Sequence, residues 1–482
     1  MIRRSLQHFH PRRQPWMTRQ SYSHELTSVM TFPLALAMVE GGTIAALANK
    51  AFAVPPALFA TIMAAPMFAN LSSFFWARLA QGRGKVRVIN VLQVALLVTV
   101  AAVALLPTHW PGPVLLTLLM IAARCIICGI VTVRSTVWRM NYPRHVRARL
   151  TSRLVLIHVL ILAFAPLIAY AALDINDNAF RVVYPVMAVT ALIGVVAYSR
   201  IRLRGEKELL RHETARVRRF NPQAESEPYY EYDPARQTDT TTAPRETILS
   251  VLRNDRPYRH YLTWHFISGL GMQMSQVAIV HLITERLTRD LTLFGWRIEY
   301  FTAIALTVTI PMGVAVLTMP LFARYFDRVH IAAFRSFQAK WWVVLQITNF
   351  FAAYLAFHHT GSIALPLALV SVARVLQGVC QGGGVLAFNL GHNDFAKRHD
   401  ATLYMGLNVS AAGVRGIVAA FLGMGLYLGW ESRHWLGITL PAFAGIGPYV
   451  FLITTACTTI SLFGFTSLSR SIARAGQVAP TD

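Results

Sequence analysis

The sequence predicts an all-α integral membrane protein with twelve transmembrane helices in two six-helix lobes related by pseudo-symmetry. The first observation is composition: of 482 residues, 55% are hydrophobic and only 14% are charged, whereas a typical soluble protein carries about 25% charged residues. The mean hydropathy of +0.45 agrees. The second observation is a series of long apolar stretches, and the third is a set of landmarks that recurs in the two halves of the chain.

The apolar stretches define the predicted helices. A helix needs about 20 apolar residues to cross the hydrocarbon core of a bilayer. The stretches lie at 27–51, 55–78, 86–107, 113–137, 153–173, 179–200, 260–284, 298–322, 333–356, 362–390, 401–428 and 445–467. The first exceeds the apolar core of about 7–15 residues of a signal peptide, so we expect it to remain in the protein.

Basic residues predict the orientation in the membrane. Lys and Arg number 45 against 22 Asp and Glu, a net charge of +23. With twelve spans, the loops and termini on one side hold 36 of the basic residues and the opposite loops hold 6. Because basic residues collect on the cytoplasmic side, we expect both termini to be cytoplasmic and the protein to lie in the cytoplasmic (inner) membrane. This explains the positive charge without a nucleic-acid partner.

The spans and loops divide the chain into five predicted segments. They are a basic cytoplasmic tail at 1–26, an N-terminal lobe at 27–200, a cytoplasmic linker at 201–259, a C-terminal lobe at 260–467 and a second cytoplasmic tail at 468–482. The linker contains a stretch rich in Pro, Glu, Tyr and Thr, which is typical of flexible segments. It is either a solvated tether between the lobes or a regulatory, partner-binding segment.

The two halves share an internal repeat. Matching landmarks are separated by 245 to 250 residues. The pairs are Pro66-Met67 with Pro311-Met312, Ala77-Arg78 with Ala323-Arg324, and Ala123-Arg124 with Ala373-Arg374. A six-helix unit repeated in parallel orientation places a solute site between the lobes near the middle of the membrane.

At these motifs the sequence resembles the major facilitator superfamily. That family has a loop signature, roughly G-x-L-x-D-R-x-G-R-R, between spans 2 and 3. The segment 77–86 keeps Leu79, Gly84 and Lys85 but has Gln81 in place of the aspartate, and the second copy at 323–330 keeps Asp327-Arg328. The resemblance implies a latch on the cytoplasmic face of each lobe. The predicted latch residues are Arg78, Gly84, Lys85, Arg324, Asp327 and Arg328.

Four ionisable residues lie at similar depth inside the predicted spans, namely Glu40, Arg124, Arg374 and Arg415. A charge in hydrocarbon costs at least about 2.5–3.5 kcal/mol, so such residues face partners or a water-filled cavity. Three arginines and one carboxylate leave a positive surplus, and the arginine fork suits carboxylates or phosphates. Protonation of Glu40 would change this charge, which is the minimum requirement for proton coupling. The alternative is a fixed salt bridge from Glu40 to Arg124 or Arg415.

Polar residues form a stripe along the tenth span. At 100° per residue, its members fall within one 120° sector. They are Arg374, Gln377, Gln381, Asn389 and His392. The stripe either lines a solute pathway or packs as a polar seam against other spans. In the eleventh span, Asn408 shares a face with Arg415, and Gly413 and Gly416 permit close helix approach.

These patterns predict a secondary active transporter of a small polar, anionic solute, coupled to protons through Glu40 and working by alternating access as a monomer in the lipid bilayer. The predicted solute ligands are Arg124, Arg374, Gln377, Gln381, Asn408 and Arg415. One alternative is a proton-driven drug efflux antiporter, because Arg374 to Gly378 fits the R-x-x-Q-G motif of proton-coupled members of the family. Another is a non-transporting sensor or scaffold. We expect no enzyme activity, no metal site and no cofactor, because the sequence contains no such constellation.

Overall fold

The computed structural model describes almost the whole chain as helices. The described residues are 11, 14–211, 252–358, 362–396, 401–435 and 438–478. Most of the predicted linker at 201–259 lies outside these ranges, as do the beginning of the N-terminal tail and the end of the C-terminal tail.

The N-terminal half contains eight described α-helices. They are α2 (Arg19–Met38), α3 (Gly41–Lys50), α4 (Pro56–Leu71), α5 (Ser73–Ala80), α6 (Lys85–Ala102), α7 (Gly112–Asn141), α8 (Arg144–Ile175) and α9 (Phe180–Ser199). Short 3-10 helices occur at η2 (Trp16–Thr18), η3 (Val103–Leu105) and η4 (Asp177–Ala179). The first predicted span is therefore two helices, α2 and α3, and the second is α4 followed by α5.

The C-terminal half adds further helices and two small hairpins. The α-helices are α12 (Arg256–Leu282), α13 (Glu299–Ile304), α14 (Ile310–Phe326), α15 (Ile331–His358), α16 (Ala364–Leu390), α17 (Asn393–Ala396), α18 (Ala401–Leu428) and α19 (Val450–Val478). Two π-helical turns, η7 (Ile283–Leu287) and η8 (Ala305–Thr309), continue α12 and precede α14, and η9 (Gly447–Tyr449) is 3-10. The antiparallel hairpins pair β1 (Thr292–Leu293) with β2 (Trp296–Arg297) and β3 (Arg433–Trp435) with β4 (Ile438–Leu440).

Ten described helical stretches are long and apolar enough to cross a membrane. The prediction of an all-helical membrane protein is thereby confirmed, although two of the twelve predicted spans fall outside this set. The second span has only the 16-residue α4 as its apolar part. The ninth, α15, is 28 residues long but polar inside, with buried Arg335, Gln346 and Asn349. Outward side chains such as Ile168, which is 75% exposed, give the bundle an apolar surface suited to lipid.

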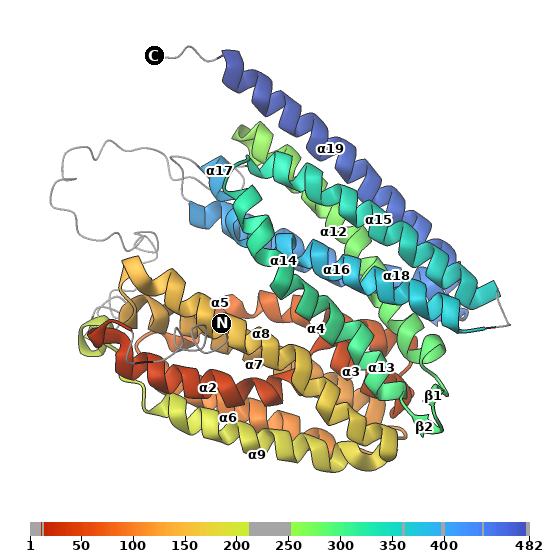
Figure 1. Ribbon diagram of the computed structural model, residues 1–482, viewed down its shortest axis with the longest axis horizontal. Helices are drawn as coiled ribbons and strands as arrows, with labels where there is room; N and C mark the ends of the chain where they lie inside the picture. Colours follow the sequence, from red (N-terminus) through yellow and green to blue (C-terminus); the bar gives the residue numbers. More distant parts are fainter. Residues whose placement is uncertain are drawn as a thin grey trace.

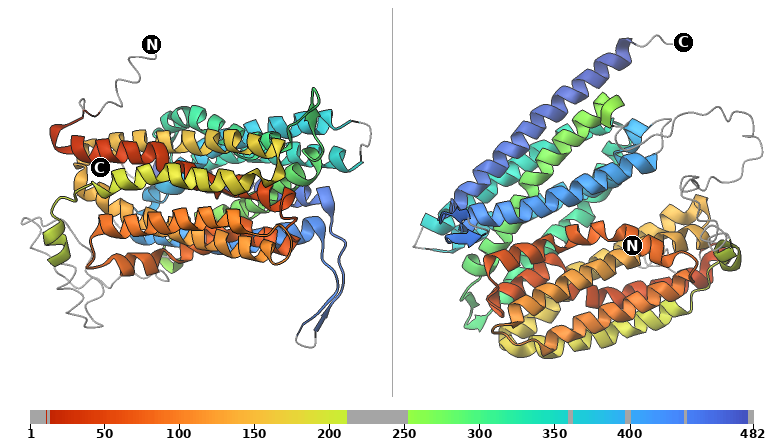
Figure 2. Two further views of the ribbon diagram at one scale, coloured as in Figure 1. Left: turned by 90° about the horizontal axis from the view of Figure 1, so that it is seen from below. Right: turned by 180° about the vertical axis from the view of Figure 1, so that it is seen from behind.

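The helices form two groups that correspond to the two halves of the chain (Figure 1). Helices α2 to α9 pack on one another, and α12, α15, α16, α18 and α19 form a second group. The groups meet where α4 packs on α18 and where α8 packs on α13 and α14. We call the end that carries α3, α13 and β1–β2 the distal end, since it lies opposite the start of α2 and the end of α19 (Figures 1 and 2).

Small residues allow the close contact between α4 and α18. A Cβ added to Gly416 would lie 2.3 Å from Cγ of Met67, and one added to Gly413 would lie 3.7 Å from Leu71. The sequence-based prediction of close helix approach is confirmed at Gly416, whereas a Cβ at Gly413 would make ordinary van der Waals contact.

Candidate solute site and distal closure

The first predicted span breaks at its centre, and the break presents Glu40. Helix α2 ends at Met38 and α3 begins at Gly41, with Glu40 in extended conformation between them. An Oε2 atom of Glu40 lies 3.3 Å from Nη1 of Arg124, which belongs to α7. Two of the four predicted central residues therefore form an ion pair.

The same break frees backbone carbonyl groups, and side chains from other helices satisfy them. Arg124 donates from Nη2 to the carbonyl oxygen of Val39 at 2.7 Å. The Tyr184 hydroxyl donates to the carbonyl oxygen of Met38 at 3.0 Å and lies 2.9 Å from the Tyr170 hydroxyl. Because an unpaired carbonyl at membrane depth costs several kcal/mol, these donors stabilise the break. Arg124 thus holds both the backbone and the carboxylate of one segment.

The Glu40 segment faces the C-terminal half of the chain. A Cβ at Gly42 would lie 2.7 Å from Val308 and 2.9 Å from the Thr307 hydroxyl, both in η8, whereas a Cβ at Gly41 would meet nothing within 4 Å. The side chain of Glu40 is 28% exposed and that of Arg124 is 12% exposed. Glu40 is therefore a partly exposed carboxylate close to the contact between the two halves.

Arg374 occupies a different environment, inside the C-terminal half. It is 1% exposed. Its Nη2 donates to Oδ1 of Asn349 at 3.0 Å, and its Nη1 donates to Oε1 of Gln377. Gln377 in turn donates to Oε1 of the half-buried Gln276 at 2.8 Å. Arg374 is therefore a centre that fixes amide side chains of α12, α15 and α16.

Arg415 and Asn408 lie apart from both of these groups. Arg415 is 8% exposed and donates from Nη1 to the carbonyl oxygen of His265 at 2.8 Å. Asn408 donates to the carbonyl oxygen of Phe388 at 3.3 Å. Among the described residues, no hydrogen bond or ion pair joins Arg374 or Arg415 to the pair of Glu40 and Arg124. The four residues that were predicted to share one charged pocket are thus not all in direct contact.

The rest of the predicted polar stripe is only partly described. Gln381 is half-buried and His392 is buried, while the side chain of Asn389 lies outside the described part of the chain. Burial lowers the pKa of His392, which follows the end of α16. The stripe therefore begins as a packed polar seam at Arg374 and Gln377.

The two predicted latches differ in construction. In the N-terminal copy, Lys85 is buried and donates from Nζ to the carbonyl oxygen of Ala80 at 2.6 Å, and Gly84 directly precedes α6. This contact satisfies a carbonyl at the end of α5. Arg78, the other predicted latch residue of this copy, is also engaged in a polar or electrostatic interaction.

In the C-terminal copy, the predicted latch side chains are exposed. They are Arg324, Asp327 and Arg328. The amide group of Ile331, at the start of α15, donates to Oδ2 of Asp394 at 2.7 Å. Asp394, rather than Asp327, therefore occupies the helix N-terminus at which the resemblance would place an aspartate.

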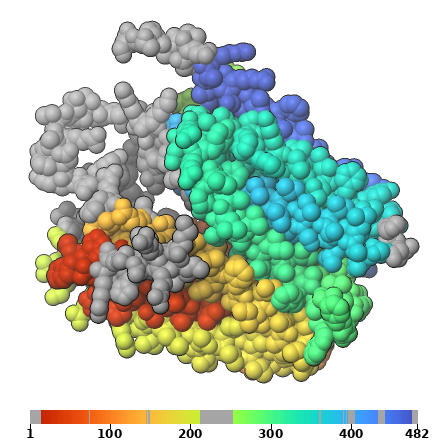
Figure 3. All heavy atoms as spheres, in the orientation of Figure 1, coloured from red at the N-terminus to blue at the C-terminus, as the bar shows by residue number. Residues whose placement is uncertain are grey.

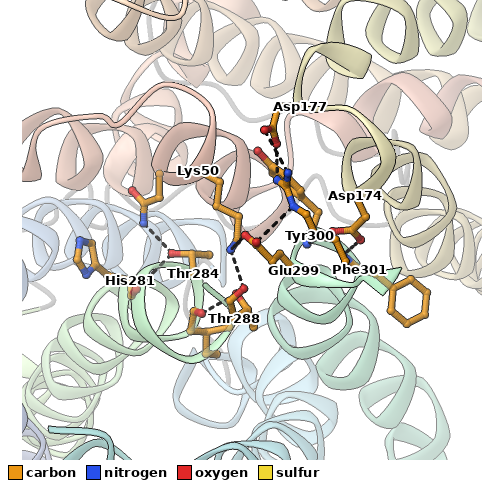
Figure 4. A network of polar contacts seen from close by, with 12 residues as sticks. Lys50, Asp174, Asp177, His281, Thr284, Thr288, Glu299, Tyr300 and Phe301 are labelled. Carbon is orange, nitrogen blue, oxygen red and sulfur yellow. Dashed lines mark hydrogen bonds and ion pairs between the residues drawn. The ribbon is translucent and has the colours of Figure 1, made fainter. Parts of the chain in front are cut away.

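A polar network closes the distal end between the two halves (Figure 4). Lys50, at the end of α3, donates from Nζ to Oε2 of Glu299 and to the carbonyl oxygen of Thr288, both at 3.0 Å. Nε of Arg297 lies 3.3 Å from the other oxygen of Glu299. The side chains of Lys50 and Glu299 are 6% and 12% exposed, so water screens this pair far less than a surface pair.

Two aspartates at the end of α8 extend the closure. Asp174 accepts hydrogen bonds from the amide groups of Tyr300 and Phe301, both at 2.8 Å, and so caps the first turn of α13 (Figure 4). Asp177 accepts two hydrogen bonds from Arg297, one of them at 3.1 Å. This contact raises the pKa of Arg297. Because both aspartates belong to one half and both partners to the other, these contacts hold the distal ends together.

Further contacts seal the distal end along its depth. Asn49 donates to Oγ1 of Thr284 at 2.7 Å, and Thr309 donates to the carbonyl oxygen of Ala163 at 2.7 Å. On the face shown in Figure 3, the green atoms of the β1–β2 region adjoin the yellow atoms of α8. Thr284 and Thr309 belong to the π-helical turns η7 and η8, a type of distortion that is frequent at functional sites.

Sequence patterns do not predict this closure. Lys50 and Arg297 are two of the six basic residues in the loops predicted to lie opposite the cytoplasm, and the acids Asp174, Asp177 and Glu299 have no predicted role. The sequence does contain an indication. Acidic residues follow the end of span 5 and lie at the start of span 8, and basic residues lie in the same set of loops. The pattern does not reveal which acid meets which base.

Comparison with known proteins identifies the fold and the family. The chain resembles solved structures of a mutant of the nucleoside transporter NupG (TM-score 0.64, 11% identity, 94% of this chain and 99% of that chain covered), a POT family transporter in complex with a thioalcohol-conjugated peptide (0.62, 12%, 95% and 97%) and a D-xylose–proton symporter (0.60, 12%, 92% and 96%). No curated protein matches its sequence. The family model of the Major Facilitator Superfamily matches residues 28–368. The chain therefore belongs to the Major Facilitator Superfamily.

Proposed function

We propose that the protein is a secondary active transporter that moves a small polar solute by alternating access. In this proposal, its twelve transmembrane helices form two six-helix lobes. Both termini lie in the cytoplasm, and the distal end lies at the opposite face of the inner membrane. The observation that supports this proposal is the position of the Glu40–Arg124 pair, which is partly exposed between the two halves while the distal end is closed. The structure corresponds, in this proposal, to the state open toward the cytoplasm.

Glu40 couples the movement of the solute to protons. When Glu40 is ionised, it neutralises Arg124, and the pair has no net charge. When Glu40 takes up a proton, the pair becomes a single guanidinium charge that attracts an anionic or electron-rich group of the solute. Protonation thus exchanges one partner of Arg124 for another, which is the differential affinity that coupling requires.

The predicted solute ligands take two roles in this proposal. Arg124 contacts the solute, together with amide groups that line the C-terminal half. The half-buried Gln381 contributes from α16. Arg374 and Gln377 act as positioning residues, because the amide atoms of Gln377 are bonded to Arg374 and Gln276. Arg415 and Asn408 form a separate group.

Transport in proteoliposomes tests the proposal. Wild-type protein is reconstituted with a pH-sensitive dye inside, and a panel of nucleosides, pentoses, dipeptides and small carboxylates is applied. We expect at least one compound to drive proton movement. The Glu40→Gln variant should exchange that compound across the membrane but should not accumulate it against a gradient when a pH difference is imposed.

The control is Glu431→Gln, which removes an exposed carboxylate from the distal loop before β3. It should accumulate the compound like the wild type. Accumulation by Glu40→Gln at the wild-type level would refute the coupling role. Absence of flux for every compound, with or without a gradient, would favour the sensor or scaffold, and export of cationic drugs would favour drug efflux.

A further inference from the structure

Three buried basic side chains lie within electrostatic range of one another in the C-terminal half, with no hydrogen bond or ion pair to the Glu40–Arg124 pair among the described residues. They are His265 of α12, Arg335 of α15 and Arg415 of α18. Their exposed fractions are 7%, 7% and 8%. His265 lies close enough to both arginines to interact with them electrostatically, and the two arginines interact with each other.

Neighbouring groups fix the position of both guanidinium groups. Arg335 donates from Nη1 to Oε1 of Gln338 at 2.9 Å, and Gln338 donates to the carbonyl oxygen of Cys380 at 2.8 Å. Arg415 donates from Nη1 to the carbonyl oxygen of His265 at 2.8 Å. Gly269 makes room for this side chain, since a Cβ there would lie 2.1 Å from its guanidinium carbon. Specific hydrogen bonds and a glycine therefore hold the two guanidinium groups in place.

Several buried nitrogen atoms of these side chains have no hydrogen-bond partner among the described residues. They are Nε and Nη2 of Arg335, Nε of Arg415 and Nε2 of His265. No described carboxylate lies within ion-pair distance of either arginine. Nε of Arg374 is also without a partner among the described residues, but amide oxygens accept hydrogen bonds from both of its Nη atoms.

Two buried guanidinium groups with no counter-charge are energetically unfavourable. Transfer of one ion from water to the interior costs several kcal/mol unless a charge and hydrogen bonds compensate, and each unpaired buried donor costs a further 1–3 kcal/mol or so. An oxyanion compensates for both, because its negative charge faces two guanidinium groups and its oxygen atoms accept from their free N–H groups. The imidazole of His265 can donate a further hydrogen bond from Nε2.

We propose that Arg335, Arg415 and His265 form a binding site for a small oxyanion, such as phosphate, sulfate or a carboxylate, inside the C-terminal half. The ring of Tyr261 stacks on that of His265 at 5.9 Å and forms one wall of the site. The site does not depend on the transport function proposed above, because it uses none of the residues of the Glu40–Arg124 pair and can be tested by binding alone.

Equilibrium dialysis of the purified full-length protein in detergent, with radiolabelled inorganic phosphate and sulfate, tests the site. Chloride salts maintain the ionic strength. We expect saturable binding of about one anion per chain. Because a hydrogen bond to a charged group contributes about 1.5–3 kcal/mol, Arg335→Gln and Arg415→Gln should each weaken binding by about tenfold or more. The matched control is Lys340→Gln, which removes an exposed positive charge from the same helix, α15, and should leave affinity within about twofold.

A thermal unfolding series keeps the test decisive if a glutamine variant folds poorly. Phosphate should raise the unfolding midpoint of the wild type and of Lys340→Gln. It should raise that of Arg415→Lys, which keeps the charge but not the planar fork, by clearly less. Equal affinity in wild type, Arg335→Gln and Arg415→Gln would overturn the proposal. So would the absence of saturable binding of both anions by wild-type protein, or an equal phosphate response in Arg415→Lys.

Discussion

Arg124 and Arg374 occupy matching positions in the internal repeat but have different partners. In the N-terminal half, Arg124 pairs with a carboxylate that is 28% exposed and with a carbonyl group freed by the break between α2 and α3. In the C-terminal half, Arg374 is 1% exposed and, within the described ranges, bonds only to the amide side chains of Asn349 and Gln377. One repeated arginine is thus placed beside a titratable group, and the other is placed in a packed polar seam.

The difference teaches how a repeated residue takes two roles. A carboxylate can gain or lose a proton, so the contact of Arg124 can change during a transport cycle. Amide oxygens do not titrate, so the contacts of Arg374 are constant with pH. In the proposed mechanism, Arg124 therefore has a partner that can change during the cycle, whereas Arg374 has fixed partners.

The largest expected effect separates the two arginines by stability. Arg374→Ala leaves a cavity and removes the N–H groups that donate to Asn349 and Gln377. It should therefore lower the free energy of unfolding by about 3 kcal/mol or more. Arg124→Ala should lower it by less, about 2 kcal/mol, because the partly exposed Glu40 can turn to water and the main loss is the donor to the carbonyl oxygen of Val39. Thermal unfolding in detergent checks both values. An equal loss in the two variants would remove the distinction between them.

Much of the fold follows from composition and periodicity. The apolar stretches give the helices, since each must satisfy its own backbone in lipid. The exceptions are physical. The first span breaks at Val39 and Glu40, where Arg124 and Tyr184 supply donors for the carbonyl groups that the break frees. The helices α2, α8 and α19 also extend past the apolar stretches, since a helix can continue into water.

The candidate site was predicted in part. The depth of Glu40 and Arg124 in their spans indicated that they could meet, and the structure pairs them. The separation of Arg415 from the Glu40–Arg124 pair was not predictable, because the hydrogen-bond acceptor of Arg415 is a carbonyl group of α12, 150 residues away. The distal closure depends likewise on contacts between residues more than 120 positions apart, such as Asp174 with Tyr300. Helical periodicity describes one helix and does not fix its neighbours.

A smaller effect tests whether distal closure needs close contact between the halves. Gly42→Val would force a side chain against Val308 and Thr307 of η8, where a Cβ has only 2.7 and 2.9 Å. We expect this overpacking to disfavour the closed distal end by about 2 kcal/mol. Labelling of a cysteine placed at exposed Phe301, beside Asp174, should then become faster.

Gly41→Val is the matched control for this experiment. It adds the same side chain to the same helix one residue earlier, where a Cβ meets nothing within 4 Å. It should leave the labelling rate near that of the parent. Equal acceleration in both variants would indicate a general loss of helix stability in α3 instead of steric opening.

The smallest effect compares the two latch copies. Asp327 is exposed and forms no ion pair with a described residue, so Asp327→Asn should change the free energy of unfolding by no more than about 0.5 kcal/mol. Lys85→Met removes a buried donor from the carbonyl oxygen of Ala80 and should cost about 1.5 kcal/mol. A larger loss for Asp327→Asn than for Lys85→Met, measured by thermal unfolding, would show that the C-terminal copy is the stronger latch. Under the expected result, the two halves differ in opposite senses: the C-terminal half loses more stability at the centre of the bundle, and the N-terminal half loses more at the latch.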